Sequence, residues 1–587
     1  MLNETGMVKL ICQKPGCQQV RVRSLLLVLL LLCVPMRPVV GQTDHTGRSE
    51  LNMIASVNPI ATDAGLKAFE QGGNAVDAAV ATALTLGVVD GFNSGIGGGC
   101  FILIRTASGE LVAIDGREMA PAAAHRDMYL RDGVADGKLS RVGPLASGVP
   151  GALKAYGEAV SRFGKLPFSL LANEAAAVAE KGFPVDRVYS GRLRSTQNYL
   201  KQFPGSAAVL LKPDGSVYQP GEVLRQQDLA HTLKMIAKLG TDWFYQGEFA
   251  RKTAEWMSEN GGIMTAEDFK NYKTVDREPV RTTYRGYEII GFPPPSSGGV
   301  HVGQILNILE AFDLAQLYQQ DPAQMRHVVA EAMKLAFADR AYWLGDPDYV
   351  KVPRGLIDKQ YAKDLAKKIN LKKASAVTAH GTPPRKDGDF FGKHTTHVSA
   401  ADAAGNWVAI TATVNTTFGS KVIVPGLGVV MNNEMDDFSI APGVPNAFGL
   451  IGGENNAVAA GKRPLSSMSP TIVLKDGQPI MTIGAAGGPK IITQVVWGII
   501  NHLDLGMPIG QSIGAPRVHH QWSPDRLSVE RSLDPSQVHR LEELGHDVSM
   551  TSSSGVTQAI AWDPEKRTFT GAHDPRVPGK AAGQQAR

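Results

Sequence analysis

Apolar and polar residues alternate from about residue 395 to 415, and this pattern predicts a β-hairpin. Alternation of period two places Thr395 on one face of the first strand and Thr396 on the other. A turn at 403–406 separates the two strands, and residues 395 and 413 are symmetric about it. We therefore expect Thr413 to lie opposite Thr395, within reach of a cross-strand contact.

Helical spacing of apolar residues predicts that the middle of the chain, from about 151 to 370, is mostly helical. Residues 75–86 are rich in alanine and apolar nearly all round, so this helix should be buried, with Asn74 as its N-cap. The Asp-Pro pair at 321–322 is a typical helix start, and this helix should run to about Leu344.

Short apolar stretches bounded by turn residues predict strands in both halves of the chain. These strands are expected at 53–57, 101–105, 110–115, 421–425, 428–432, 471–474 and 479–483. Asn58 and Pro59 are expected to form a turn before a helix that starts near Thr62. After residue 395 no helix alternates regularly with the strands, which argues against a doubly wound parallel sheet and favours a layered α+β architecture.

The N-terminal segment has the pattern of an export signal. Basic residues within the first 23 positions precede an apolar run from 24 to 34, which is too short to cross a bilayer as a helix. Small residues at 39–41 precede a possible cut before Gln42, so we expect residues 1–41 to be a signal peptide and the protein to be secreted or periplasmic. A retained signal anchor is the alternative. A lipoprotein signal at Cys33 is disfavoured by the large residue before it.

Charge and cysteine content narrow the classes of partner. The whole chain has 60 Lys and Arg against 56 Asp and Glu, and the leader carries the excess. The remainder is close to neutral, so nothing indicates binding to nucleic acid or to an anionic membrane, and no stable membrane span is expected. Only Cys100 lies outside the leader, which allows no internal disulfide, and we expect it to be a small buried residue. No cofactor and no metal site are expected.

A polar segment rich in Lys, Thr, Pro and Gly, from about 371 to 393, leads abruptly into the predicted hairpin. Such a junction is suited to being cut. A cut between His394 and Thr395 would place a hydroxyl and a free amine on one residue, and the amine could act as the base that activates the hydroxyl. The alternative is an uncut β-hairpin, because threonine is a favoured strand residue.

Several longer motifs bear on these alternatives. They are TTH at 395–397, NTTFG at 415–419, NNEMDDF at 432–438, RPLSSMSP at 463–470 and GAAGG at 484–488. In this order and spacing they resemble the γ-glutamyltranspeptidase family, and the similarity extends from about Met53 to Arg576. The resemblance implies an N-terminal-nucleophile hydrolase that is made as one chain and cuts itself. It also implies a four-layer αββα sandwich, with two antiparallel sheets between helix layers.

The resemblance implies the division of the chain as well. Residues 42–394 would form a large subunit and residues 395–587 a small catalytic subunit, which stay together as a heterodimer and one αββα domain. Thr395 would first attack the carbonyl of His394, and then the γ-carbonyl of glutathione or of another γ-glutamyl amide. The acyl group would pass to water or to the amine of an amino acid or dipeptide.

Roles for individual residues also follow from the resemblance. Thr413 would hydrogen-bond and orient Thr395, and the N–H groups of Gly487 and Gly488 would form the oxyanion hole. The glutamyl α-carboxylate and α-ammonium would be bound by oppositely charged or polar groups. For the carboxylate these are Arg117, Ser466 and Ser467, and for the ammonium they are Asn415, Glu434 and Asp437.

One departure concerns the segment 442–449, which is similar to the lid loop of the family. Bacterial members often have tyrosine where this chain has Phe448, so a hydroxyl that would latch the lid to Asn415 is missing. Two other functions remain open. One is a related amidase that acts on glutaryl or cephalosporin-type acyl groups, which lack the α-ammonium that an acid at 437 would neutralise. The other is an unprocessed protein that binds γ-glutamyl compounds without turnover.

Overall fold

The computed structural model describes residues 45–384, 396–441 and 443–586, and two seven-stranded antiparallel sheets lie at its centre. The predicted signal peptide and the predicted cut site fall outside these residues. Sheet I has the order β1-β20-β19-β15-β14-β11-β10, with bounds Thr46–Ser49, Thr568–His573, Val556–Asp563, Gln478–Ala486, Thr471–Lys475, Tyr287–Gly291 and Val280–Tyr284. Sheet II has the order β21-β2-β12-β13-β3-β4-β9, with bounds Lys580–Ala582, Asn52–Ser56, Thr396–Asp402, Trp407–Thr413, Gly99–Arg105, Leu111–Gly116 and Val275–Arg277.

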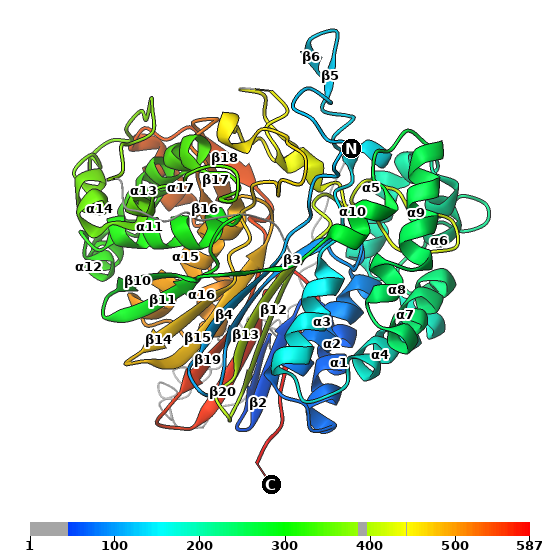
Figure 1. Ribbon diagram of the computed structural model, residues 1–587. Coiled ribbons are helices and arrows are strands. Elements are labelled where there is room, and N and C mark those ends of the chain that lie inside the picture. The colour runs from blue at the N-terminus through cyan, green and yellow to red at the C-terminus, as the bar shows by residue number, and fades with distance from the viewer. Residues whose placement is uncertain (1–44, 385–395, 442, 587) are drawn as a thin grey trace, which may run out of the picture. The chain divides into compact units, whose positions relative to one another are not determined.

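Helices cover the outer faces of both sheets (Figure 1). The helices that belong with sheet II are α1 Pro59–Glu70, α2 Ala75–Val89, α3 Ala152–Phe163, α4 Phe168–Lys181, α5 Arg187–Leu200, α6 Pro204–Leu210, α7 Gln227–Leu239, α8 Asp242–Tyr245, α9 Glu248–Glu259 and α10 Ala266–Asn271. Those that belong with sheet I are α11 Ser297–Leu309, α12 Leu314–Gln320, α13 Pro322–Trp343, α14 Lys359–Ala366, α15 Lys490–Leu503, α16 Ile509–Gly514 and α17 Pro535–Glu543.

Buried apolar residues form a separate core at each interface between layers. One core joins sheet II to its helices and includes Ile102 and Val80. A second joins sheet I to its helices and includes Ile483 and Val495. A third, which includes Phe101, lies between the two sheets. Helix, sheet, sheet and helix therefore pack in this order, and the predicted four-layer αββα sandwich is confirmed.

Smaller elements complete the described part of the chain. A three-stranded sheet contains β16 Val518–His519, β17 Leu527–Glu530 and β18 Val548–Thr551. Two two-stranded sheets pair β5 Leu130–Arg131 with β6 Val134–Ala135 and β7 Phe183–Pro184 with β8 Val223–Leu224. The 3₁₀ turns are η1 Pro144–Ala146, η2 Arg354–Ile357, η3 Glu434–Asp437 and η4 Glu454–Asn456. Of the helices within the described ranges, none is both long and apolar enough to cross a bilayer.

Local sequence signals explain the two helices that were predicted most closely. Helix α2 begins with a capping box in which Asn74 and Asp77 satisfy each other's backbone N–H groups, and nearly all of its residues are buried. Helix α13 begins at Pro322, and the side chain of Asp321 caps it as expected.

Other predictions were wrong. Asn58 and Pro59 do not form a turn before a later helix, because Asn58 is the N-cap of α1 and Pro59 its first residue. The strands expected at 421–425 and 428–432 are absent from the sheets. The two segments meet only in an isolated bridge between Ile423 and Val430, since neither pairs with a longer strand.

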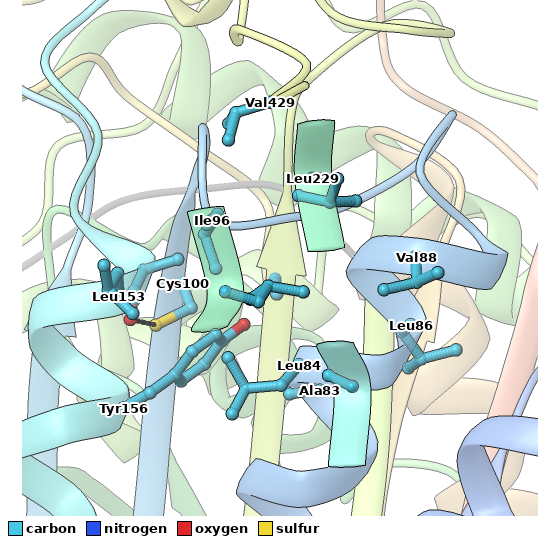
Figure 2. Packing of buried hydrophobic residues seen from close by; sticks show 14 of the residues in the cluster. Ala83, Leu84, Leu86, Val88, Ile96, Cys100, Leu153, Tyr156, Leu229 and Val429 are labelled. Carbon is cyan, nitrogen blue, oxygen red and sulfur yellow. Dashed lines mark hydrogen bonds between the residues drawn. The ribbon is translucent and has the colours of Figure 1, made fainter. Parts of the chain in front are cut away.

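Cys100 is completely buried in β3, as predicted. Its Sγ lies 3.9 Å from the carbonyl oxygen of Ala152, and Figure 2 shows it among apolar side chains beside Leu153 and Tyr156. Burial raises the pKa of the thiol well above its ordinary value. The side chain is therefore a packing residue and not a nucleophile.

Candidate active site

The hairpin of β12 and β13 lies at the centre of sheet II, between β2 and β3 (Figure 1). The structure describes β12 from Thr396 onward, so the calls on His394 and Thr395 lie outside the described residues. Thr396 pairs with Ala412. This is the register that the predicted pairing of Thr395 with Thr413 requires, and that pairing itself stays a prediction.

Side chains of β12 alternate between two environments. Thr396 faces the helices, and its hydroxyl donates to Asp90 at 3.1 Å. His397 faces sheet I, and its two ring nitrogens lie 3.0 Å from the hydroxyls of Thr411 and Ser399. Burial lowers the pKa of His397 to about 3, so this imidazole is neutral and held as a structural group.

The segment after β13 makes a sharp change of direction at Asn415, whose φ is +73°. Its N–H donates to the hydroxyl of Thr413 at 2.7 Å, and its side-chain amide donates to the carbonyl of Asn433 at 2.9 Å. The Oδ1 atom of Asn415 is buried without a hydrogen-bond partner among the described residues. A buried acceptor of this kind is suited to an added donor.

Arg117 is completely buried among carboxyl groups. Its Nη1 lies 2.5 Å from Oε1 of Glu434, and its Nη2 lies 2.8 Å from Oδ2 of Asp437. Glu118 is 3.4 Å from Nη1. One guanidinium thus faces three carboxyl groups, and burial raises the pKa of Glu434 well above its ordinary range although Arg117 opposes this. One guanidinium can balance only one of the three groups as a carboxylate, so an added cation would allow a second to ionise.

The position of Arg117 is fixed at three points. Its N–H donates to the side chain of Asp115 at 2.9 Å, its carbonyl accepts the hydroxyl of Tyr272 at 2.7 Å, and its Nε donates to the carbonyl of Pro464 at 3.2 Å. The last contact joins the arginine to the segment that carries the predicted serine pair. The guanidinium is therefore preorganised to face a charged group at this place.

Ser466 and Ser467 are both fully buried. The carbonyl of Ser466 accepts the N–H of Ser297 at 3.2 Å and also the Ser297 hydroxyl. The Ser297 oxygen in turn accepts Nε–H of Arg340 at 3.2 Å. The Ser467 hydroxyl has no hydrogen-bond partner within the described part of the chain. The start of α11 thus supports the serine pair, a role that the sequence analysis did not assign to it.

Gly487 and Gly488 connect β15 to α15 with φ values of +134° and +64°, which favour glycine. Their N–H groups reach no acceptor among the residues that the structure describes. They lie just before a helix N-terminus, where unpaired N–H groups favour negative charge. A Cβ on Gly488 would lie 2.8 Å from the ring of Phe448, so the phenyl ring packs directly on this glycine.

The loop that contains Phe448 is held without a hydroxyl at that position. Asn446 donates to Oδ1 of Asp437 at 3.1 Å, and the N–H of Ala447 donates to Asp436 at 2.8 Å. The carbonyl of Phe448 accepts the side chain of Gln521 at 3.3 Å. These three bonds tie the loop to the acidic turn η3 and to the segment after α16.

The described candidates form one contact network. The side chain of Asn415 donates a hydrogen bond to the carbonyl of Asn433, which precedes Glu434 in the charged cluster. Asp437 accepts a hydrogen bond from Asn446, in the loop whose phenyl ring covers Gly488. The structure thus brings together Arg117, Thr413, Asn415, Glu434, Asp437, Ser466, Ser467, Gly487 and Gly488. Such a site combines fixed charges with free backbone donors, the requirements for acyl transfer on a charged substrate.

The family model for gamma-glutamyltranspeptidase matches residues 61–584. This chain belongs to the γ-glutamyltranspeptidase family. The match spans nearly all of the described residues, and the resemblance seen in the sequence is confirmed.

Proteins and solved structures that are similar to this γ-glutamyltranspeptidase family member support the same family assignment. The glutathione hydrolase proenzyme of Escherichia coli (strain K12) is 44% identical over 535 residues, which cover 91% of each chain. The crystal structure of cephalosporin acylase from Bacillus halodurans has a TM-score of 0.82 at 29% identity, and the match covers 92% of this chain and 97% of the other. That of Helicobacter pylori gamma-glutamyltranspeptidase has a TM-score of 0.53 at 41% identity, covering 54% and 90%.

Sequence reasoning missed Asp90, Arg340 and Asn446. Asp90 accepts the hydroxyl of Thr396, next to the predicted nucleophile, and Arg340 donates to Ser297, which supports Ser466. Asn446 donates to the candidate residue Asp437. Burial raises the pKa of Asp90 to about 7 and lowers that of Arg340 to about 10. Nothing in the spacing of Asp90 or Arg340 signals these contacts. Asn446 lies in the predicted lid loop, two residues before Phe448. Asparagine side chains often form hydrogen bonds in turns, so its role could have been predicted from the sequence.

Proposed function

We propose that this protein is a self-processing γ-glutamyl acyltransferase and hydrolase, which cleaves the γ-glutamyl amide bond of glutathione and related compounds. Membership of the γ-glutamyltranspeptidase family across residues 61–584 carries this proposal. The buried cluster of one guanidinium and three carboxyl groups supports it, because a γ-glutamyl head group brings one carboxylate and one ammonium.

Maturation would use the hydroxyl of Thr395. Its Oγ attacks the carbonyl carbon of His394, the C–N bond to Thr395 breaks as the acyl group moves to oxygen, and water hydrolyses the ester. The products would be residues 42–394 and 395–587 once the leader is removed, and they would remain associated as two subunits. The pattern of residues 1–41 supports export through a signal peptide.

Turnover would use the same oxygen. The α-amine of Thr395, with an ordinary pKa near ~8, takes the hydroxyl proton while Oγ attacks the γ-carbonyl. Thr413 would orient the nucleophile, and the N–H groups of Gly487 and Gly488 would stabilise the oxyanion, where one donor is typically worth ~3–4 kcal/mol. The proton passes to the departing amine, and water or an acceptor amine then resolves the ester.

Binding of the head group would be an exchange of ion pairs. Arg117 is bonded to Glu434 and Asp437 in this structure. We propose that the substrate carboxylate, assisted by Ser466 and Ser467, takes over part of the guanidinium. The substrate ammonium would take the released carboxylates together with Asn415. Such an exchange keeps each buried charge paired before and after binding.

An amidase for glutaryl or cephalosporin-type acyl groups is the second candidate, and the likeness to a cephalosporin acylase favours it. A glutaryl group has no ammonium to pair with the surplus carboxyl groups around Arg117. The charge of the site therefore favours γ-glutamyl substrates.

Turnover of a chromogenic γ-glutamyl anilide and of its glutaryl counterpart, by the wild type and by Thr395→Ala, tests the proposal. We expect γ-glutamyl turnover and two fragments on a denaturing gel for the wild type. The variant should give one band and no turnover. Equal rates in the two proteins, or an active chain that stays whole, would refute the mechanism, and preference for the glutaryl anilide would select the amidase.

A further inference from the structure

Three side chains with metal-binding atoms meet in a group that shares no residue with the candidate active site. His327 and Glu331 lie one turn apart on α13, and His546 lies between α17 and β18, elements that are grouped together in Figure 1. Their ligand atoms all lie within 4.8 Å of one another. Exposure of the three residues is 0%, 2% and 7% respectively, so the group is closed to solvent.

The hydrogen bonds of His327 fix which of its nitrogens faces the group. Nε2 lies 2.8 Å from the carbonyl oxygen of Asn370, and because a carbonyl can only accept, Nε2 carries the proton. In a neutral ring, Nδ1 then presents a lone pair, and it lies 2.8 Å from Nε2 of His546. Donation of the outer N–H to a backbone carbonyl is the arrangement that orients metal-binding histidines.

Glu331 offers one carboxylate oxygen to the same place. Its Oε2 accepts the N–H of Ser375 at 2.9 Å, whereas the buried Oε1 has no hydrogen-bond partner within the described ranges. Oε1 is paired with the ammonium of Lys334 at 3.1 Å. Lys334 also donates to the carbonyl of Ser375 at 2.9 Å and pairs with Asp525 at 3.1 Å, so it keeps partners if Oε1 turns to another cation.

We propose that Nδ1 of His327, Nε2 of His546 and Oε1 of Glu331 bind a divalent transition metal ion of the zinc type. Two imidazoles and one carboxylate suit zinc and its neighbours, and not calcium or magnesium, which prefer oxygen ligands. Metal–nitrogen bonds of about 2.0–2.1 Å in a tetrahedral site set the nitrogens about 3.3 Å apart. The two imidazole nitrogens, which are 2.8 Å apart, would separate by about half an ångström, and the Glu331 oxygen, within 4.8 Å of them, would move closer.

We assign the ion a structural role because the three ligand residues are buried, and its fourth ligand would be a water. The ion joins α13 to the segment between α17 and β18. His327 and Glu331 precede the proposed cut and His546 follows it, so in the processed enzyme the ion connects the two fragments. This last consequence rests on the proposed function, but metal binding itself does not.

Titration of chelator-treated, dialysed protein with Zn²⁺, with metal analysis of the product, tests the site. We expect about one tightly held zinc per chain in the wild type and in Thr395→Ala, whether or not the chain is cut. Glu331→Gln and His546→Gln keep side-chain volume and should each lower zinc affinity by at least about tenfold. His539→Gln is the matched control, since this histidine of α17 is 74% exposed, and its affinity should equal that of the wild type.

Circular dichroism and the unfolding temperature of each metal-free variant establish that it is folded before titration. Cobalt provides a second measurement, because Co²⁺ bound by two imidazoles and one carboxylate has a visible absorption spectrum that should be present in the wild type and lost in His546→Gln. Folded wild type without tight zinc binding would overturn the proposal and leave a hydrogen-bonded histidine pair. Unchanged affinity in both folded variants would also overturn it, by assigning the zinc to other residues.

Discussion

Replacing Asp437 by asparagine tests the charge logic of the candidate site. Oδ2 of Asp437 lies 2.8 Å from Nη2 of Arg117, and its Oδ1 accepts Asn446. Asparagine keeps the size and one acceptor but removes the charge. Arg117 retains Glu434 at 2.5 Å and Glu118 at 3.4 Å, so the guanidinium does not lose all its partners and the fold should persist.

The expected loss can be derived from this geometry. A hydrogen bond to a charged group contributes about 1.5–3 kcal/mol, and about 1.4 kcal/mol corresponds to tenfold, so kcat/KM for a γ-glutamyl anilide should fall about 10- to 150-fold. The α-ammonium is distant from the reacting carbonyl, so it is bound equally in the ground state and the transition state, and the loss should be mainly in KM.

Initial rates with γ-glutamyl and glutaryl anilides, measured for the wild type and Asp437→Asn, give the comparison. A glutaryl group lacks the ammonium, so the substitution should leave its slow turnover unchanged or raise it. A denaturing gel provides the control, because the extent of self-cleavage should not change. Equal losses for both substrates would refute the assignment of Asp437 to the ammonium, as would an unchanged kcat/KM for the γ-glutamyl anilide.

Two further predictions concern buried positions near the hairpin. A Cβ at Gly484 would lie 2.3 Å from Nδ1 of His397, so Gly484→Ala should destabilise the protein by about 1–3 kcal/mol in thermal denaturation. The control is Gly191→Ala in helix α5, where a Cβ would meet nothing within 4 Å, and this variant should be neutral or stabilising. Equal melting temperatures for the two would contradict this packing. Burial raises the pKa of Asp90 from 3.8 to about 7, so the folded state holds a proton that the unfolded state has lost, and stability should fall as pH rises between about 4 and 7. Asp90→Asn should therefore lose less stability than the wild type between pH 5 and pH 8, and an identical loss in both would show that Asp90 ionises normally.

Much of the fold could be predicted where local signals and tertiary structure agree. Helix α2 combines a capping box with an apolar surface, and both are visible in the sequence. The hairpin of β10 and β11 was missed inside a region expected to be mostly helical. Its turn has positive φ at Arg285 and Gly286, a local hairpin signal, but its stability comes from pairing of β11 with β14, which follows about 180 residues later.

The types of residue in the site could be predicted, but not their contacts. Arg117, Glu434 and Asp437 were each expected to face one charge of a substrate. Arg117 pairs directly with Glu434 and Asp437, although 317 and 320 positions of the chain separate it from them. No local sequence pattern encodes contacts between residues so far apart. The same holds for the phenyl ring of Phe448 on Gly488, because this contact depends on how the loop after η3 folds back onto the turn before α15.

The interleaving of the chain explains how a cut before Thr395 could leave an intact enzyme. In sheet II, β12 and β13 lie between β2 and β3, so strands from after the proposed cut are bonded on both sides to strands from before it. Buried ion pairs such as Arg117 with Glu434, and Asp115 with Arg463 at 2.6 Å, also join the two parts. Separating the fragments would break five strand ladders, which pair β1 with β20, β11 with β14, β2 with β12 and with β21, and β3 with β13. It would also leave these charges unpaired, which is far more costly than the gain from freeing one chain end. A cut before Thr395 would therefore change the chemistry at that residue while the sheets and buried charges hold the candidate site in place.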